Sequence, residues 1–198
     1  METNKLIIFV KNPIQGKVKT RLAAEIGEAP ALEIYKTLLK HTHQVATNTQ
    51  EVSISVYYAD FVNNNDLWNN FDKKLQEQQD LGSRMNHAIK SEMENGFQNI
   101  IIIGSDCLEI NPQHIQKAFL SLKTNDIVIG PAEDGGYYLI GLKSLIPDIF
   151  KNKKWSTDTV FIDTIEDINR LNLKHMILET LCDIDTKKDL DRYKITIE

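Results

Sequence analysis

The sequence has little cysteine, no long apolar run and no cluster of positive charge, and each shortage excludes a class of protein. Only Cys107 and Cys182 are present, without C-x-x-C spacing, which argues against a disulfide framework and favours a reducing, cytosolic compartment. The first apolar run, residues 6–10, is too short to cross a membrane and carries no cleavage-site pattern. We therefore expect a cytoplasmic protein without a transmembrane segment.

The charge balance argues against nucleic acid as a partner. The net charge is −5 and no dense basic run occurs, whereas binding to duplex nucleic acid needs clustered Lys and Arg. A small anionic ligand needs only a few local cations and stays possible. With 198 residues, 41% of them hydrophobic, the chain suits one α/β domain, and we expect a single domain over residues 1–198. The sequence does not indicate an oligomeric state.

Apolar segments of strand character alternate with segments of helical periodicity. Residues 6–10 and 99–104 predict buried strands, the second with four consecutive isoleucines, and further strands are expected at 52–56, 126–129, 137–142 and 176–178. One-sided apolar stripes predict helices at 32–46, 67–75, 85–93, 115–122, 157–171 and 187–193. This alternation favours a doubly wound, mainly parallel sheet with helices on both faces, whose ligands bind beyond the carboxyl ends of the strands.

A basic loop follows the first strand. Residues 11–22 combine Gly16, which lets the backbone approach a ligand closely, with four cations, among them Lys19 and Arg21. The segment lacks the G-x-x-x-x-G-K-[ST] pattern of a P-loop. Phosphate binding and a solvated basic loop are both compatible with this composition.

Two acidic segments are candidate metal ligands. Asp106 follows the isoleucine strand, where it could bind Mg²⁺ or Mn²⁺ or cap the next turn through a backbone N–H. Asp183 and Asp185 flank Ile184, so both point the same way from an extended segment and repel unless a cation or donors offset them. Capping of the last helix by Asp185 or Thr186 is the alternative.

Three further segments fit a ligand or an ordinary structural role. Residues 130–138 contain Asp-Gly-Gly between two strands, which suits either a hairpin turn or a sugar or acceptor site. Gly82 and Arg84 open a helix, whose N-terminus favours an anion, but a turn with a solvated arginine is also possible. Trp155 could stack on a sugar, although filling the core is the more common role of tryptophan.

Taken together and in order, these segments resemble the GT-A-like (Rossmann-like) nucleotide-diphospho-sugar transferase superfamily. They are most similar to the transferase family associated with radical-SAM and selenodomain proteins, itself similar to phospholactate guanylyltransferases. The resemblance covers residues 5–190, and the stretches that carry it are Lys-Asn-Pro…Gly-Lys-Val-Lys-Thr-Arg-Leu, Asp-Leu-Gly-Ser-Arg-Met, Gly-Ser-Asp-Cys, Asp-Gly-Gly-Tyr-Tyr-Leu-Ile-Gly-Leu and Asp-Ile-Asp-Thr…Asp-Leu. The chain departs from the family pattern at Leu108 and Lys187, where proline often stands.

The resemblance implies a role for each segment. It assigns Asp106 and Asp185 to the metal and Lys19, Arg21 and Asp134 to catalysis together with Asp106. The residues that it assigns to nucleotide and phosphate are Lys11, Gly16, Lys19, Arg21, Gly82 and Arg84. The residues that it assigns to the sugar or acceptor are Asp134, Gly135, Gly136 and Tyr137, and we add Trp155 to them as a stacking surface.

Three functions are compatible with these roles. The first is a metal-dependent glycosyltransferase with a nucleotide-sugar donor and a small-molecule acceptor, in which Asp134 could act as the base. The alternative is a nucleotidyltransferase that joins an NTP to a phosphorylated acceptor and releases pyrophosphate. The third is a binding module on a retained scaffold, because a fold does not determine a function.

Overall fold

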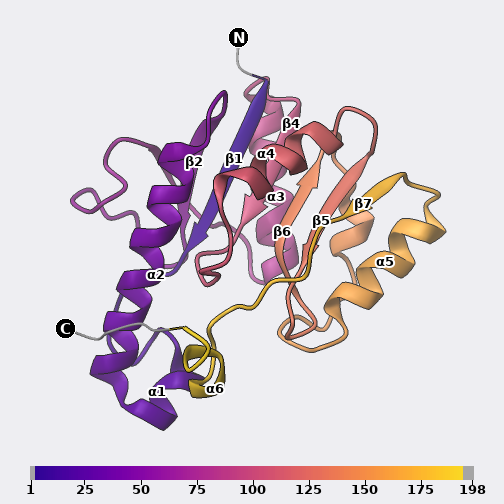
Figure 1. Ribbon diagram of the computed structural model, residues 1–198. Helices are drawn as coiled ribbons and strands as arrows, with labels where there is room; N and C mark the ends of the chain where they lie inside the picture. The colour runs from indigo at the N-terminus through magenta and orange to yellow at the C-terminus, as the bar shows by residue number, and fades with distance from the viewer. Residues whose placement is uncertain (1–2, 194–198) are drawn as a thin grey trace.

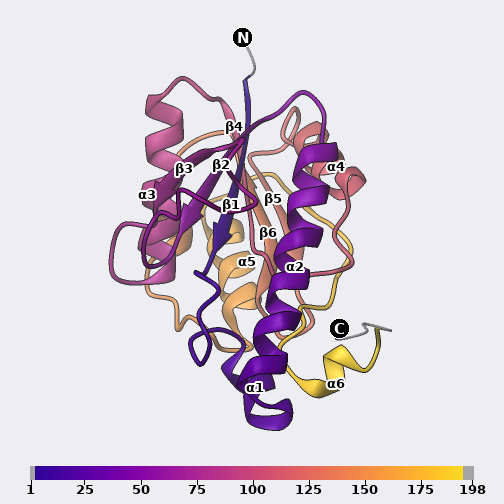
Figure 2. The same ribbon diagram turned by 90° about the vertical axis from the view of Figure 1, so that its left-hand side faces the viewer.

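The central strands are apolar on both faces because helices cover both faces of the sheet. In a computed structural model, which describes residues 3–193, the four isoleucines of β4 (Asn99–Ile103) alternate between two layers. Ile101 and Ile103 pack against α2 (Glu28–Asn48) and α4 (Pro112–Ser121), whereas Ile100 and Ile102 pack on the side of α3 (Leu81–Glu94) and α5 (Val160–Arg170). Figure 2 shows the two pairs of helices on opposite sides of the sheet.

Seven strands form one mixed sheet (Figure 1) in the order β3-β2-β1-β4-β6-β5-β7. The remaining strands are β1 (Asn4–Val10), β2 (Ser53–Tyr58), β3 (Asp72–Leu75), β5 (Ile127–Pro131), β6 (Tyr137–Leu142) and β7 (His175–Ile177). β6 pairs antiparallel with both β4 and β5, and all other pairings are parallel. The predicted fold class, a doubly wound and mainly parallel mixed sheet, is therefore confirmed.

Two short helices lie at the end of the sheet where β1 and β4 finish: α1 (Thr20–Ile26) follows the basic loop, and α6 (Lys187–Leu190) contacts α1. A third, η1 (Pro147–Phe150), follows β6 and contacts α3 and α5. In Figure 1 both α1 and α6 lie at the bottom, near the C-terminal end of the β1 arrow. None of the helices within residues 3–193 is long and apolar enough to cross a membrane.

The predicted helix at residues 67–75 is wrong. Residues 67–71 form a turn and a bend, and β3 begins at Asp72, where it pairs in parallel with β2. The apolar spacing that suggested a helix has another cause, because Trp68 and Phe71 both turn inward and contact the His43 ring of α2 at centroid distances of 5.3 and 5.5 Å. Backbone pairing with β2 satisfies the N–H and C=O groups that a helix would have satisfied internally. The helix expected at 157–171 starts later, at Val160, and the one expected at 187–193 ends at Leu190.

Candidate functional site

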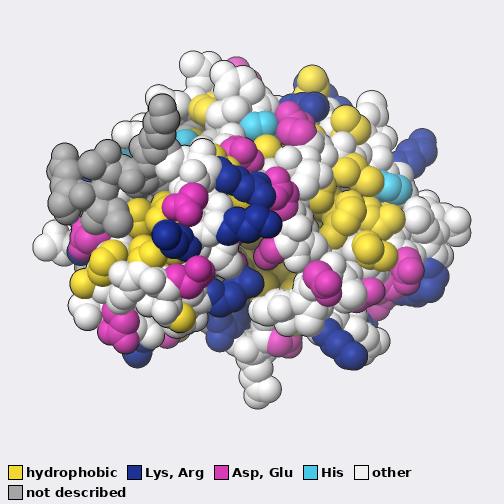
Figure 3. Space-filling model, turned by 60° about the horizontal axis from the view of Figure 1, so that its bottom comes forward, with side chains coloured by type: hydrophobic (Ala, Val, Ile, Leu, Met, Phe, Trp, Pro, Cys, Tyr) yellow, Lys and Arg dark blue, Asp and Glu magenta, His cyan; other side chains and the backbone are white. Residues whose placement is uncertain are grey.

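A cavity of about 670 Å³ opens at the carboxyl ends of β1 and β4. Its walls come from separate parts of the chain: the β1–α1 loop and the start of α1, Asp106 just beyond β4, the β5–β6 turn, the loop before α5 and residues 183–185. Tyr35 of α2 and Leu81 of α3 also line it. Of the residues that the sequence assigns to a site, it is lined by Lys11, Lys19, Arg21, Asp106, Asp134, Gly136, Tyr137, Trp155 and Asp185. Figure 3, seen with this end of the molecule turned forward, shows Lys and Arg side chains interspersed with Asp and Glu in the middle of the face.

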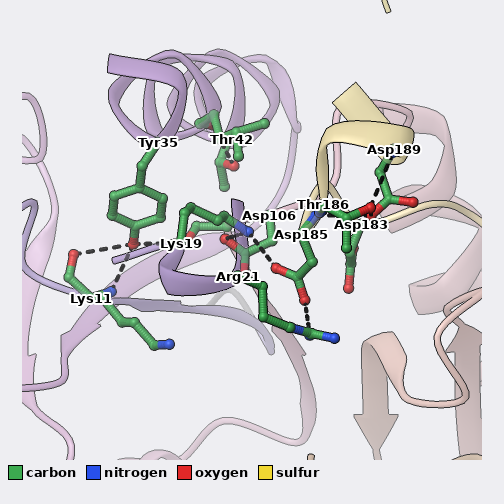
Figure 4. A network of polar contacts seen from close by, with 12 residues as sticks. Lys11, Lys19, Arg21, Tyr35, Thr42, Asp106, Asp183, Asp185, Thr186 and Asp189 are labelled. Atoms are coloured by element: carbon green, nitrogen blue, oxygen red, sulfur yellow. Dashed lines mark hydrogen bonds and ion pairs between the residues drawn. The ribbon is translucent and has the colours of Figure 1, made fainter. Parts of the chain in front are cut away.

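Lys19 joins the two predicted metal ligands. Its Nζ lies 2.8 Å from Asp106 Oδ1 and 2.9 Å from Asp185 Oδ1, and its side chain is only 3% exposed. Arg21 Nη2 donates to the other oxygen of Asp185, Oδ2, from the solvent side. Figure 4 shows the four side chains converging from α1, the end of β4 and the segment before α6. Side chains as far apart in the sequence as Lys19 and Asp185 thus form one charged cluster.

Backbone pairing places the two acidic segments side by side. The Ile184 N–H donates to the Asp106 carbonyl at 3.0 Å, and Cys107 and Asp183 form an antiparallel bridge. Thr186, rather than Asp185, caps α6, because its hydroxyl accepts the Asp189 N–H and the Asp189 carboxylate accepts the Thr186 N–H. Asp185 is therefore free to pair with Lys19 and Arg21. Among residues 3–193 the Asp106 carboxylate accepts no backbone N–H, so it does not serve as a turn cap.

The charges in the cluster shift the pKa values of its members. Burial lowers the pKa of Lys19, but Asp106 and Asp185 outweigh it and hold that pKa above its usual range. Burial raises the pKa of Asp185, yet Lys19 and Arg21 keep it below its usual range. Burial, reinforced by the nearby charge of Asp106, raises the pKa of Asp183 to about 8. At neutral pH the Asp183 carboxyl therefore keeps its proton, whereas Asp185 is held as the anion.

Tyr35 of α2 holds the basic loop against the end of β4. Its hydroxyl accepts the Lys11 N–H at 2.9 Å, donates to the Lys11 carbonyl at 3.1 Å and lies 3.2 Å from Ser105 Oγ. Burial, with the charge of Asp106, raises the pKa of Tyr35 to about 12, so the hydroxyl keeps its proton at neutral pH. These bonds fix the separation between the two strand ends that carry Lys11 and Asp106.

The opposite wall comes from the β5–β6 turn and the loop before α5. The turn is a hairpin, as one interpretation of its sequence predicted, with Ala132 N–H bonded to the Gly136 carbonyl at 3.0 Å. The Asp134 carboxylate accepts the Gly136 N–H at 3.0 Å and is exposed toward the cavity. The ring of Tyr137 meets that of Trp155 edge-on at 6.5 Å. This wall thus combines a carboxylate with a pair of aromatic rings.

Four assigned residues lie outside this cavity. Gly16 has φ +76° and faces Glu28, and Gly135 has φ +86° and packs so closely on Asp158 that a Cβ would lie 2.1 Å from its carbonyl oxygen. Arg84 donates from Nε to the Gln78 carbonyl at 3.0 Å. Gly82 lines a second cavity of about 420 Å³, which shares only Trp155 with the first.

Gly82 fixes the position of Trp155. A Cβ at residue 82 would lie 2.3 Å from the indole and 2.6 Å from the Phe150 carbonyl oxygen. We expect Gly82→Ala to displace Trp155, change the tryptophan fluorescence and destabilise the fold by about 1–3 kcal/mol. Gly104→Ala is the control, because a Cβ there meets nothing within 4 Å. Urea unfolding followed by fluorescence measures both, and equal stabilities would contradict the close packing.

Several cavity residues were not assigned from the sequence. The sequence singles out Asp183 only as the neighbour of Asp185, and the alternation of the two residues is the signal that it shares the site. Lys17 is one of four cations in the basic loop, and nothing in the sequence separates it from the others. The remaining unassigned residues are polar positions next to Trp155 and side chains from distant helices; they include Tyr35, Leu81, Ser156, Thr157 and Asp158.

Comparisons with known proteins agree with this architecture. The family model for "Uncharacterized protein conserved in bacteria (DUF2064)" matches residues 39–157. A 2-phospho-L-lactate guanylyltransferase of Methanocaldococcus vulcanius is 27% identical over 192 residues, which cover 93% of this chain and 82% of the relative. Two solved structures also match, and each superposes on 96% of this chain.

A Desulfovibrio desulfuricans protein provisionally named a nucleotide-diphospho-sugar transferase is 32% identical, with a TM-score of 0.88 and 86% of its chain covered. The inositol-1-phosphate CTP transferase of T. maritima is only 11% identical, with a TM-score of 0.62 and 92% of its chain covered, and so shows the fold alone. The chain belongs to the DUF2064 family and has the fold of the nucleotide-diphospho-sugar transferases.

Proposed function

We propose that this protein is a metal-dependent nucleotidyltransferase, which joins an NTP to a phosphorylated small molecule and releases pyrophosphate. The observation that carries the proposal is the single cavity in which the carboxylates of Asp106, Asp183 and Asp185 face the cations of the β1–α1 loop. Glycosyl transfer, the function that the sequence analysis gives first, becomes the alternative. The names of the relatives favour this order, since they include a guanylyltransferase and a CTP transferase.

The donor set of the cavity fits a hard divalent cation. Asp106, Asp183 and Asp185 offer carboxylate oxygens, the ligands that Mg²⁺ and Mn²⁺ prefer. Among residues 3–193 no three Asp, Glu, His or Cys side chains are arranged to hold an ion by themselves. This suits Mg²⁺, which commonly uses one or two protein carboxylates and completes its shell with substrate phosphates and water. We assign the ligands to Asp106 and Asp185, and the Asp183 carboxyl lines the same cavity.

The reaction is an in-line displacement at the α-phosphorus. An oxygen of the acceptor phosphate attacks, a new P–O bond forms, and the bond to the β-phosphate breaks so that pyrophosphate leaves with the electron pair. A bound Mg²⁺ would neutralise the phosphates and orient them. Lys11, Lys17 and Arg21 line the same cavity and would contact the same phosphates. An ionised acceptor phosphate needs no base, so Asp134 would act in binding, whereas an acceptor hydroxyl in glycosyl transfer would need it.

Product analysis tests the proposal. The protein is incubated with each NTP, Mg²⁺ or Mn²⁺ and a panel of phosphorylated hydroxy acids and sugar phosphates, and pyrophosphate is measured. We expect release that needs both NTP and acceptor and is absent from the Asp106→Ala variant. Release of a nucleoside diphosphate from a nucleotide-sugar, with no pyrophosphate from any NTP, would establish glycosyl transfer instead. Nucleotide binding without either product would indicate a binding module.

A further inference from the structure

The ammonium group of Lys19 lies between the two carboxylates that we assign to the metal. Its contacts of 2.8 Å to Asp106 Oδ1 and 2.9 Å to Asp185 Oδ1 use one oxygen of each carboxylate (Figure 4). The Lys19 side chain is 3% exposed, so water screens these contacts little. A divalent cation that contacts the same two oxygens would meet the ammonium charge at close range. The metal and the ammonium therefore compete for this position.

The backbone of the basic loop fixes this placement. Lys19 has φ 49° and ψ 44°, a left-handed conformation that non-glycine residues seldom adopt, directly before α1. Its carbonyl accepts the Ala23 N–H at 2.7 Å, and its neighbour Val18 and the helix residue Leu22 are buried in the core. The fold thus holds a strained residue in the orientation that brings its side chain between the carboxylates.

The other cations of the cavity are placed differently. Arg21 contacts only the outer oxygen of Asp185 and is 65% exposed. Lys11 and Lys17 are exposed and, among residues 3–193, enter no ion pair. They can meet an incoming phosphate without first leaving a carboxylate. The ammonium of Lys19 can bind a phosphate only by leaving Asp106 and Asp185, and this frees both carboxylates.

We propose that Lys19 is a resident counter-ion, which keeps the metal out until substrate phosphate arrives. Phosphate draws the ammonium away from Asp106 and Asp185, and the carboxylates then take the metal together with phosphate oxygens. The metal alone binds weakly, and the metal and the triphosphate bind cooperatively. This inference rests on the metal site of the proposed function.

Binding of Mn²⁺ without nucleotide, measured by electron paramagnetic resonance, tests the competition. Lys19→Met should tighten Mn²⁺ binding by about tenfold or more, because the competing charge is gone. Lys17→Met is the matched control, since it removes the same charge from the same cavity without opening the position between the carboxylates, and should change Mn²⁺ affinity by less than about twofold. Unchanged or weaker Mn²⁺ binding in Lys19→Met would overturn the proposal, as would an equal gain in both variants.

Two measurements keep the inference testable if Lys19→Met does not fold. Lys19→Arg retains the charge and should bind Mn²⁺ as weakly as the unmodified protein. In the unmodified protein, the ¹⁵N NMR signal of the Lys19 ammonium is identified by its absence from the spectrum of Lys19→Arg. This signal should keep its chemical shift with Mg²⁺ alone and change it when tripolyphosphate is added. A shift with Mg²⁺ alone would contradict the proposal. Neither result depends on pyrophosphate release, so failure of the proposed reaction would be seen separately.

Discussion

Replacing Asp106 by alanine is expected to abolish metal-dependent nucleotide binding and to lower kcat/KM by about 10³-fold or more. The side chain is the candidate ligand that follows β4, a strand held between β1 and β6. Without it the metal would keep at most the ligands of the segment before α6. A loss of several kcal/mol of charge stabilisation corresponds to this fold-change, since about 1.4 kcal/mol is tenfold.

The same variant should keep its fold. Asp106 is 38% exposed on its side chain, and Lys19 retains Asp185 as a partner at 2.9 Å. We therefore expect only a small change in melting temperature. Calorimetric titration of an NTP with and without Mn²⁺, next to a melting curve, measures both effects. Equal nucleotide affinity in the variant would remove Asp106 from the metal site, and a collapse of the melting temperature would give it a structural role.

The largest expected loss of stability lies outside the cavity, on the α3 face of the sheet. Glu92 of α3 is 1% exposed and accepts bonds from Tyr57 Oη and Lys74 Nζ, both at 2.8 Å, while Lys5 Nζ lies 3.6 Å away. Lys5 is itself buried. Glu92→Gln removes the charge that these lysines need and should cost about 3 kcal/mol of unfolding free energy. Glu94→Gln on the same helix, with a side chain 67% exposed, should cost less than about 0.5 kcal/mol.

This network also gives the protein an acid dependence. Burial raises the pKa of Glu92, but the bonds from Lys74 and Tyr57 and the charge of Lys5 hold it below its usual range. A carboxylate whose pKa is lowered by folding stabilises the protein above its unfolded pKa and ceases to do so as the pH falls through the folded value. The unmodified protein should therefore lose more stability than Glu92→Gln does as the pH falls below about 4.5. Parallel acid profiles in urea unfolding would show that Glu92 does not contribute.

The prediction from sequence succeeded where local pattern and burial agree. The isoleucines of β4 predict a strand covered on both faces, and they pack into both layers. It failed at residues 67–75, because the helical spacing of Trp68 and Phe71 reflects two separate contacts with α2 rather than one helix face. Edge-strand pairing of β3 with β2 is a long-range interaction that local spacing does not encode.

For the candidate site, the sequence determined which residue types follow the strands: cations after β1, an acid after β4 and a pair of acids before α6. These follow from strand ends and turn chemistry, which are local properties. Only the tertiary structure decided which of them meet. It paired Lys19 with Asp106 and Asp185, left Gly16 and Arg84 outside the cavity, and added Asp183 to the cluster. The physical reason is that ion pairs form only between atoms a few ångströms apart. That distance depends on how the strands are ordered in the sheet and how their loops fold, and not on the order of the residues along the chain.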